Sequence, residues 1–478
     1  MVVVPLLTAP LAVLIRVPKL VFPLAFAATA TSAACAAMLL ATVDDPLSYH
    51  LGGWPPPIGI EYRITRASAL VTTLVTSIAL IAITLGMRGT RREIHERPQL
   101  FYSAFLLCLT GLLGMVVTAD AFNVFVFLEI SSLSTYALVA MGPRRRAFNA
   151  AFNYLVLGTI GGTFVLIGVG LLYQMTGTLN GLDIASRMES VGGLRTVHVA
   201  FGFLVIGFAI KLAVFPLHQW LPNAYVESPS AVSSFLAGTA TKVIYFQMIR
   251  IVVVVFGAAY VFDNLRFGLV LGPLSVLAMF IGSLAAIYQH SLKRLLAYSS
   301  IGQVGYLTLA LSLGTESGVA AGLLHMGAHA VTKTALFMVA AVFIAAVGND
   351  RLESLAGVGR KMPLVGIAFV LGGIGLIGVP GTAGFVSKWA LLQAALESGH
   401  PWIAGLVLLS SLLAVVYVWR VVEVLYFREP PERELRMDWG AFVPAAALLI
   451  LSLVAGVWNE SLTEMVRAAA QQLMAGSP

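Results

Sequence analysis

Apolar stretches long enough to cross a membrane recur along almost the whole chain. The hydrocarbon layer of a bilayer is ~30 Å thick, and a helix of roughly 20 apolar residues spans it. These stretches are continuous, whereas the strands of a membrane barrel alternate in hydropathy over about 10 residues. Hydrophobic residues make up 59% of the chain and charged residues only 11%, too few to give a soluble protein its polar surface. The sequence therefore predicts an all-α polytopic membrane protein.

The hydropathy pattern predicts about 14 transmembrane helices. The first apolar run has no basic residue ahead of it, so we interpret it as a retained span and not as a signal peptide. The spans are expected near residues 2–15, 20–42, 68–87, 100–118, 121–141, 150–175, 197–217, 231–258, 267–289, 295–313, 319–347, 363–396, 401–427 and 440–458.

The distribution of basic residues between loops predicts the orientation, because Lys and Arg accumulate in cytoplasmic loops. With both termini outside, the inner loops carry Arg16, Lys19, Arg88, Arg91, Arg92, Arg97, Arg144, Arg145, Arg146, Lys293, Arg294, Arg351, Arg360, Lys361, Arg428, Arg433 and Arg436. The outer loops and the C-terminal tail carry only Arg63, Arg66, Arg187, Arg195, Arg266 and Arg467. We therefore expect a multi-pass protein of the bacterial cytoplasmic membrane. Its net charge of +7 reflects this topology and the lipid bilayer, and does not indicate a nucleic-acid partner.

Several charged side chains remain inside the predicted spans. Four of them are lysines: Lys211, Lys242, Lys333 and Lys388. Each ion at a helix centre costs about 2.5–3.5 kcal/mol on insertion scales, so these positions need a function or a partner. A desolvated lysine can release its proton near neutral pH, whereas arginine keeps its charge. The four lysines are therefore candidate proton-transfer groups, although any one of them could simply tie helices together.

Other ionisable groups extend this set. Glu129 lies deep in a span and is expected to form a gated ion pair with Lys211. His325, His329 and Lys333 follow one another at one-turn spacing on one helical face. Histidine titrates near neutral pH, which favours a proton relay. A metal site is disfavoured because this span offers no third ligand. Arg250 and Arg420 lie nearer to span ends, and Glu423 is one turn from Arg420, so snorkelling or local pairing is expected for them.

Two predicted spans contain helix breakers close to a lysine. Pro216 cannot donate a hydrogen bond to the carbonyl of Leu212, which follows Lys211. Gly378, Pro380, Gly381 and Gly384 interrupt a second span just before Lys388. The two breaks are five spans apart, which predicts two inverted five-helix repeats, as in many secondary transporters. We expect N-terminal helices over residues 1–99, the repeats over 100–262 and 263–428, and a last helix with a C-terminal tail over 429–478.

Five segments of the chain resemble those of a known family: DAFNVFVFLEISSLSTYALV, IKLAVFPLHQWLPNAYVESPSAVSSFLAGTATK, KRLLAYSSIGQVGY, HMGAHAVTKTALF and PGTAGFVSKW. They are similar to segments of the proton-conducting antiporter-like membrane subunits. Within that family the chain looks most like the D-type component of Mrp-type cation/proton antiporters, and at greater distance it is similar to the complex I antiporter-like subunits.

The resemblance implies a fourteen-helix fold with inverted repeats and a central hydrophilic axis. It implies that Glu129 is the partner of Lys211, Lys242 a bridging lysine, His325 and His329 the central relay, and Lys388 the terminal lysine. It further implies partnership with other membrane subunits, protons and a monovalent cation.

Three functions remain open from the sequence. The first is a proton-translocating, non-enzymatic subunit of a multisubunit Na⁺/H⁺ or related antiporter. The second is the same module in a complex I-type oxidoreductase or a membrane hydrogenase, and the third is a stand-alone carrier of an organic solute. No Cys cluster or Gly-rich nucleotide loop is found, so we expect no cofactor on this chain. Four buried lysines are more than a solute carrier requires.

Overall fold

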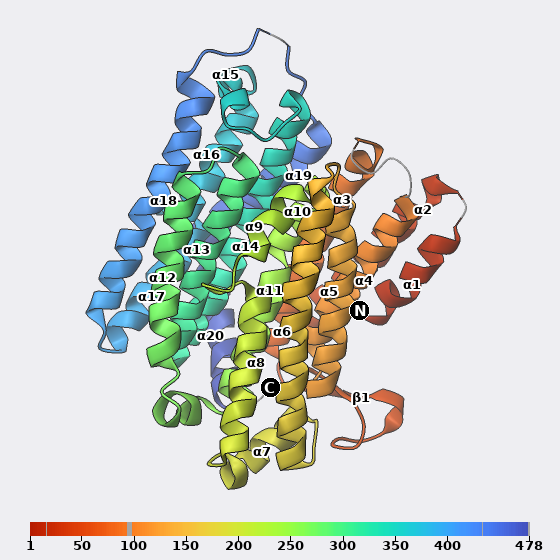
Figure 1. The fold of residues 1–478 in the computed structure, drawn as a ribbon, viewed down its shortest axis with the longest axis vertical. Coiled ribbons are helices and arrows are strands. Elements are labelled where there is room, and N and C mark those ends of the chain that lie inside the picture. Colours follow the sequence, from red (N-terminus) through yellow and green to blue (C-terminus); the bar gives the residue numbers. More distant parts are fainter. Residues whose placement is uncertain (16, 93–97, 433, 477–478) are drawn as a thin grey trace.

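The computed structural model describes residues 1–15, 17–92, 98–432 and 434–476. Arg16, Arg97 and Arg433, which contributed to the charge distribution, lie outside the described residues. Nearly all of the regular structure is helical (Figure 1). The helices are α1 (Val3–Leu14), α2 (Pro18–Thr42), α3 (Arg66–Arg92), α4 (Pro98–Val117), α5 (Ala121–Ala140), α6 (Arg146–Thr176), α7 (Gly181–Val191), α8 (Arg195–Leu212), α9 (Trp220–Glu227), α10 (Ser230–Gly238), α11 (Ala240–Ile249), α12 (Gly268–Ile287), α13 (Leu292–Ser312), α14 (Glu316–Val347), α15 (Val358–Lys361), α16 (Pro363–Ile377), α17 (Ala383–Glu397), α18 (Pro401–Phe427), α19 (Trp439–Val457) and α20 (Glu460–Met474).

The predicted polytopic helical fold is confirmed. Within the described residues, 11 helices are long and apolar enough to cross a membrane, if Ser230–Val255, which includes α10 and α11, is counted as one. The number rises to 12 if a bent pair counts as one span. Three further predicted spans fall on helices outside those 11. They are α1, which has only 12 residues; α13, whose first turn carries Lys293 and Arg294; and the broken pair α16 and α17.

The long helices run between two ends of the molecule (Figure 1). The short helix α15 and the connection from α18 to α19 lie at one end, at the top of the view, while α7 and the β1 hairpin lie at the other. The top end therefore holds two of the basic loops that the charge distribution assigns to one side of the membrane.

Several elements outside the predicted spans were not predicted from the sequence. Strands β1 (Leu47–His50) and β2 (Glu61–Ile64) form an antiparallel hairpin before α3. Helix α7 is short and connects α6 to α8. The stretch expected to be a C-terminal tail forms the amphipathic helix α20, which buries Val466, Ala469, Ala470 and Leu473 and packs against α14 and α3.

An ion pair at the top end joins segments that are far apart in sequence. Arg144, between α5 and α6, donates to Asp350, after α14, at 2.8 Å. The Ser291 hydroxyl also donates to the Asp350 carboxylate. Burial raises the pKa of Asp350, but the hydrogen bonds from Ser291 and Arg144 outweigh it, so that this pKa lies below its ordinary value. The charged carboxylate is thus stabilised where the two loops meet.

The arginines near span ends bind backbone carbonyls. Arg250 donates to Thr118 O at 2.8 Å, at the C-terminal end of α4, where carbonyls have no partner within the helix. Arg420 donates to Ile287 O at the end of α12. Glu423 pairs instead with Arg428, at 3.2 Å. Of the two accounts expected for Arg420, snorkelling or local pairing, the pairing with Glu423 is therefore wrong, because a helix-end carbonyl lies within reach of the guanidinium.

Candidate functional site

Lys211 and Glu129 lie on neighbouring helices and approach each other inside the bundle. Lys211 Nζ is 3.5 Å from Glu129 Oε1. The ammonium also donates to Ser132 Oγ at 2.7 Å and to Tyr136 OH at 3.3 Å, both on α5. The lysine side chain is 3% exposed and the glutamate side chain 24%. The ammonium is therefore shared between one carboxylate and two hydroxyls, so loss of the carboxylate contact would leave it with neutral partners.

Glycine on α6 provides the space for this carboxylate. A Cβ at Gly162 would lie 2.1 Å from Glu129 Oε1, which no real contact allows. A Cβ at Gly170, two turns further along the same helix, would meet no atom within 4 Å. Gly162 thus lets α6 approach the Glu129 carboxylate closely.

The first predicted helix break follows Lys211. Helix α8 ends at Leu212, Ala213 has a positive φ of 60°, and a helix resumes only at Trp220. The Trp220 indole donates to Ile210 O at 2.8 Å. The break thus begins ahead of Pro216, and the Ile210 carbonyl accepts from both Trp220 and the backbone N–H of Ala213.

Lys242 lies at a helix break that the sequence did not predict. Helix α10 ends at Gly238 and α11 begins at Ala240, with Thr239 between them in a non-helical conformation. The Lys242 ammonium donates to Ala237 O and, at 3.2 Å, to Thr241 Oγ1. Its side chain is fully buried. A single glycine, Gly238, directly precedes the gap, and on its own it did not distinguish this span from the others.

The histidines and Lys333 lie together on α14, as their spacing predicted. The rings of His325 and His329 are stacked with centroids 6.1 Å apart. His325 Nδ1 is 3.0 Å from Ser387 Oγ, while His325 Nε2 and both ring nitrogens of His329 are buried with no partner among the described residues. Lys333 donates to Leu296 O at 2.8 Å and to Ser299 Oγ, both on α13. Unpartnered imidazole nitrogens can exchange protons with water or with each other.

Metal coordination is not supported around these histidines. Within the described ranges, no group of three or more His, Cys, Asp or Glu side chains is arranged to hold a metal ion.

Lys388 lies at the second predicted break. Helix α16 ends at Ile377, Gly378 and Gly381 have positive φ angles of 88° and 87°, and α17 begins at Ala383 beyond Pro380. Lys388 Nζ donates to Leu376 O at 2.9 Å, to Ile377 O at 3.0 Å and to Ser411 Oγ at 3.0 Å. The lysine thus binds carbonyls that the end of α16 leaves free.

The structure brings these groups into one series of packed helices. Helix α8 packs against α11, α10 packs against α14, and α14 packs against α17. The series carries Lys211, Lys242, the histidines with Lys333, and Lys388 in that order. The hydroxyl partners Ser132, Tyr136, Ser299, Ser387 and Ser411 were not predicted, because Ser and Tyr are common in apolar spans and nothing in their spacing distinguishes them.

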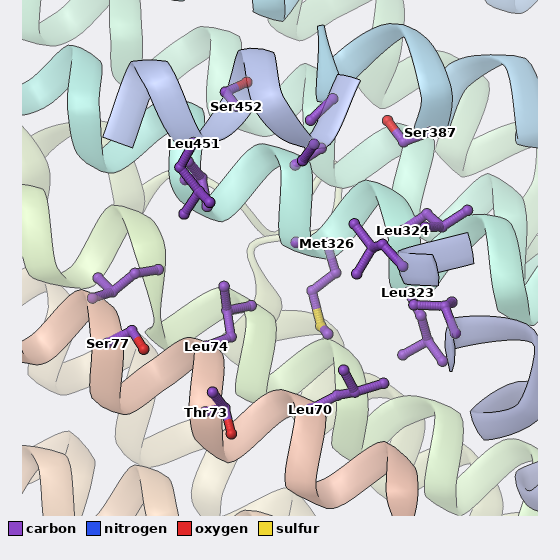
Figure 2. Close-up of a pocket in the computed structure, with 18 of the residues that line it drawn as sticks. Leu70, Thr73, Leu74, Ser77, Leu323, Leu324, Met326, Ser387, Leu451 and Ser452 are labelled. Carbon is purple, nitrogen blue, oxygen red and sulfur yellow. The ribbon is translucent and has the colours of Figure 1, made fainter. Parts of the chain in front are cut away.

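An apolar cavity adjoins this series (Figure 2). It has a volume of about 310 Å³ and lies between α3, α14, α17, α19 and α20. Leu70, Leu74, Leu323 and Met326 line it, and Ser387 lies at its edge. Its lining carries scattered hydroxyls and no charged side chain among the described residues. This cavity therefore does not offer a polar organic solute a set of converging groups.

Comparison with known proteins gives concordant matches in sequence and in structure. The family model described as NADH:quinone oxidoreductase/Mrp antiporter, TM matches residues 118–414. The N-type component of an NADH-quinone oxidoreductase from Desulforudis audaxviator is 38% identical, with 97% of this chain and 96% of that protein covered. The D-type component of a Na(+)/H(+) antiporter from Bacillus subtilis is 31% identical, with 89% and 85% covered. A chain in the structure of the Mrp complex from Dietzia sp. DQ12-45-1b superimposes with a TM-score of 0.92 at 26% identity, with 99% of this chain and 96% of that chain covered.

The close approach of α6 to Glu129 generates a testable expectation. Gly162→Ala should displace the carboxylate and lower proton flux through membrane vesicles by about tenfold, because overpacking of this kind costs about 1–3 kcal/mol. Gly170→Ala is the matched control on the same helix and should leave the flux unchanged. Both variants are compared at equal amounts in the membrane. Equal flux in the two variants would mean that the position of Glu129 does not matter.

Proposed function

Because this chain belongs to the NADH:quinone oxidoreductase/Mrp antiporter transmembrane family, we propose that it is a proton-translocating subunit of a multisubunit monovalent cation/proton antiporter. The family resemblance carried by the sequence motifs is confirmed. The observation that carries the proposal is the series of four buried lysines on packed helices, of which one has a carboxylate at 3.5 Å. Buried lysines held mainly by neutral oxygen atoms are suited to releasing and accepting protons.

The Glu129 and Lys211 pair supplies the gate in this proposal. When the carboxylate is close, it stabilises the charged lysine; when it withdraws, Ser132 and Tyr136 remain as neutral partners and the ammonium is destabilised. The proton then moves toward the centre of the helix bundle, to Lys242 and the stacked histidines. His329 suits the central step because both of its ring nitrogens are free of partners among the described residues. Lys333 shares the same helix face, and Lys388 receives the proton at the far break.

A second function is supported by a specific observation. The 38% identity to an N-type component of an NADH-quinone oxidoreductase covers almost the whole of both chains. This likeness favours the same proton-translocating module in a complex I-type oxidoreductase or an energy-converting hydrogenase, where redox partners would drive it. In either assembly this chain is a transporter subunit. The identity of the other subunits in the complex distinguishes the antiporter from the redox-driven assembly.

Purification of the intact complex tests these alternatives. A tagged chain should copurify from the membrane with small membrane subunits, and the complex in liposomes should exchange protons for Na⁺ or K⁺ across an imposed pH gradient. The isolated chain should be inactive, since cation and proton paths are distributed among subunits in this proposal. Iron–sulfur companions would favour the redox-driven assembly instead. Full cation-dependent exchange by the chain alone would contradict both alternatives.

We also propose that the chain lies in the bacterial cytoplasmic membrane with both termini outside. Basic loops lie at the end of the molecule that holds α15 (Figure 1), and this supports the orientation because Lys and Arg accumulate in cytoplasmic loops. In a variant with Cys35 and Cys108 replaced by alanine, Ser190→Cys on α7 should react with a membrane-impermeant maleimide added to intact cells, and Glu353→Cys should react only after lysis. The reverse pattern would mean that the orientation is inverted.

A further inference from the structure

The ring of Tyr306 lies between the central histidines and Lys388. Tyr306 is on α13 and is 1% exposed. Lys388 Nζ is 4.6 Å from the centroid of its ring. The His325 ring centroid is 5.4 Å from the same ring. Tyr306 therefore contacts both of the groups between which the last proton transfer of the proposed function takes place.

The surroundings of Lys388 lack a counter-charge. In the part of the chain that the structure describes, no carboxylate pairs with Lys388. The groups that face it are the carbonyls of Leu376 and Ile377 on α16 and the hydroxyl of Ser411 on α18. Helix α13 contributes the Tyr306 ring, and α14 contributes the His325 imidazole. Lys211 differs, since it has the Glu129 carboxylate as well as an aromatic neighbour.

We propose that the face of the Tyr306 ring takes the place of a carboxylate and stabilises the protonated form of Lys388, which makes Tyr306 a positioning residue for proton transfer. A cation within about 6 Å of an aromatic centroid is attracted by the negative face of the ring, most strongly where water is excluded. A ring gives weaker stabilisation than an ion pair does, so the lysine holds its proton without being locked in the charged state.

The hydroxyl of Tyr306 has a separate role, which is to hold the ring in place. It donates to Ser410 Oγ at 3.0 Å and lies 3.3 Å from Ser411 Oγ. Ser411 in turn accepts from Lys388. The ring is thus anchored at one end by α18 and presents its face to the ammonium, so that the π-electrons and not the phenolic proton act on Lys388.

A fluorination series distinguishes these contributions in the intact complex. The inference rests on the proposed function, so Lys388→Ala is measured first and should abolish proton exchange. Tyr306→Phe keeps the ring and should retain at least about a third of the wild-type rate, whereas Tyr306→Leu should lose about tenfold or more. Mono-, di- and trifluorophenylalanine at position 306 should then lower the rate stepwise, because each fluorine withdraws electron density from the ring face without a large change in volume.

Tyr245 on α11 provides the matched control. It is also fully buried, but no cation lies over its ring among the described residues. The same fluorination series at position 245 should be flat. Complex assembly is checked for every variant, so that the rates refer to folded protein.

The possible outcomes separate the inference from the proposed function. An active Lys388→Ala variant would overturn the proposed role of Lys388 itself. An inactive Lys388→Ala variant together with a flat series at position 306 would overturn the role of the ring alone. An assembled but inactive Tyr306→Phe variant would also overturn it, because exchange would then be lost although the aromatic ring is still present. A stepwise decline at position 306 and none at position 245 would support it.

Discussion

The structure depends on one constraint: each lysine ammonium buried at membrane depth needs oxygen atoms that accept its hydrogen bonds. An unpartnered charge there is costly, and the membrane offers no water to offset the lost hydration. Two of the four buried lysines meet this cost with backbone oxygen atoms that interrupted helices leave free. Lys388 binds the last carbonyls of α16, and Lys242 binds a carbonyl at the gap between α10 and α11. Breaks that would weaken an ordinary span thus provide the acceptors that make these lysines tolerable.

The two broken spans solve the same problem differently. Lys211 has Glu129 at 3.5 Å, whereas Lys388 has carbonyls, a hydroxyl and an aromatic ring. A carboxylate can move away and change the charge balance abruptly, while backbone carbonyls are fixed. The environment of Lys211 can therefore change when the carboxylate moves. The environment of Lys388 stays nearly the same when that lysine receives a proton. The predicted inverted repeats account for the paired breaks, and stay a prediction.

Much of this arrangement could be predicted from the sequence, for physical reasons that particular residues illustrate. A lysine inside an apolar run is conspicuous, and proline or glycine beside it marks a break, so the surroundings of Lys211 and Lys388 could be located. The gap at Thr239 could not, because the helix breaker beside it is the single Gly238, and glycine is common in membrane-spanning helices. Arg420 shows another limit: the acid one turn away suggested a pair, but a carbonyl of α12, distant in sequence, binds the guanidinium. Contacts between remote segments leave no local pattern.

The central claim is that the buried lysines release and rebind protons, and do not serve as fixed charges. Lys242 tests it most directly, because it is fully buried and lies in the middle of the series. In Lys242→Arg the guanidinium keeps its charge and can still donate to Ala237 O, but it cannot release a proton near neutral pH. Proton exchange by the assembled complex in liposomes should fall to background in Lys242→Arg, as in Lys242→Gln. An arginine variant with near wild-type exchange, beside an inactive glutamine variant, would contradict the account.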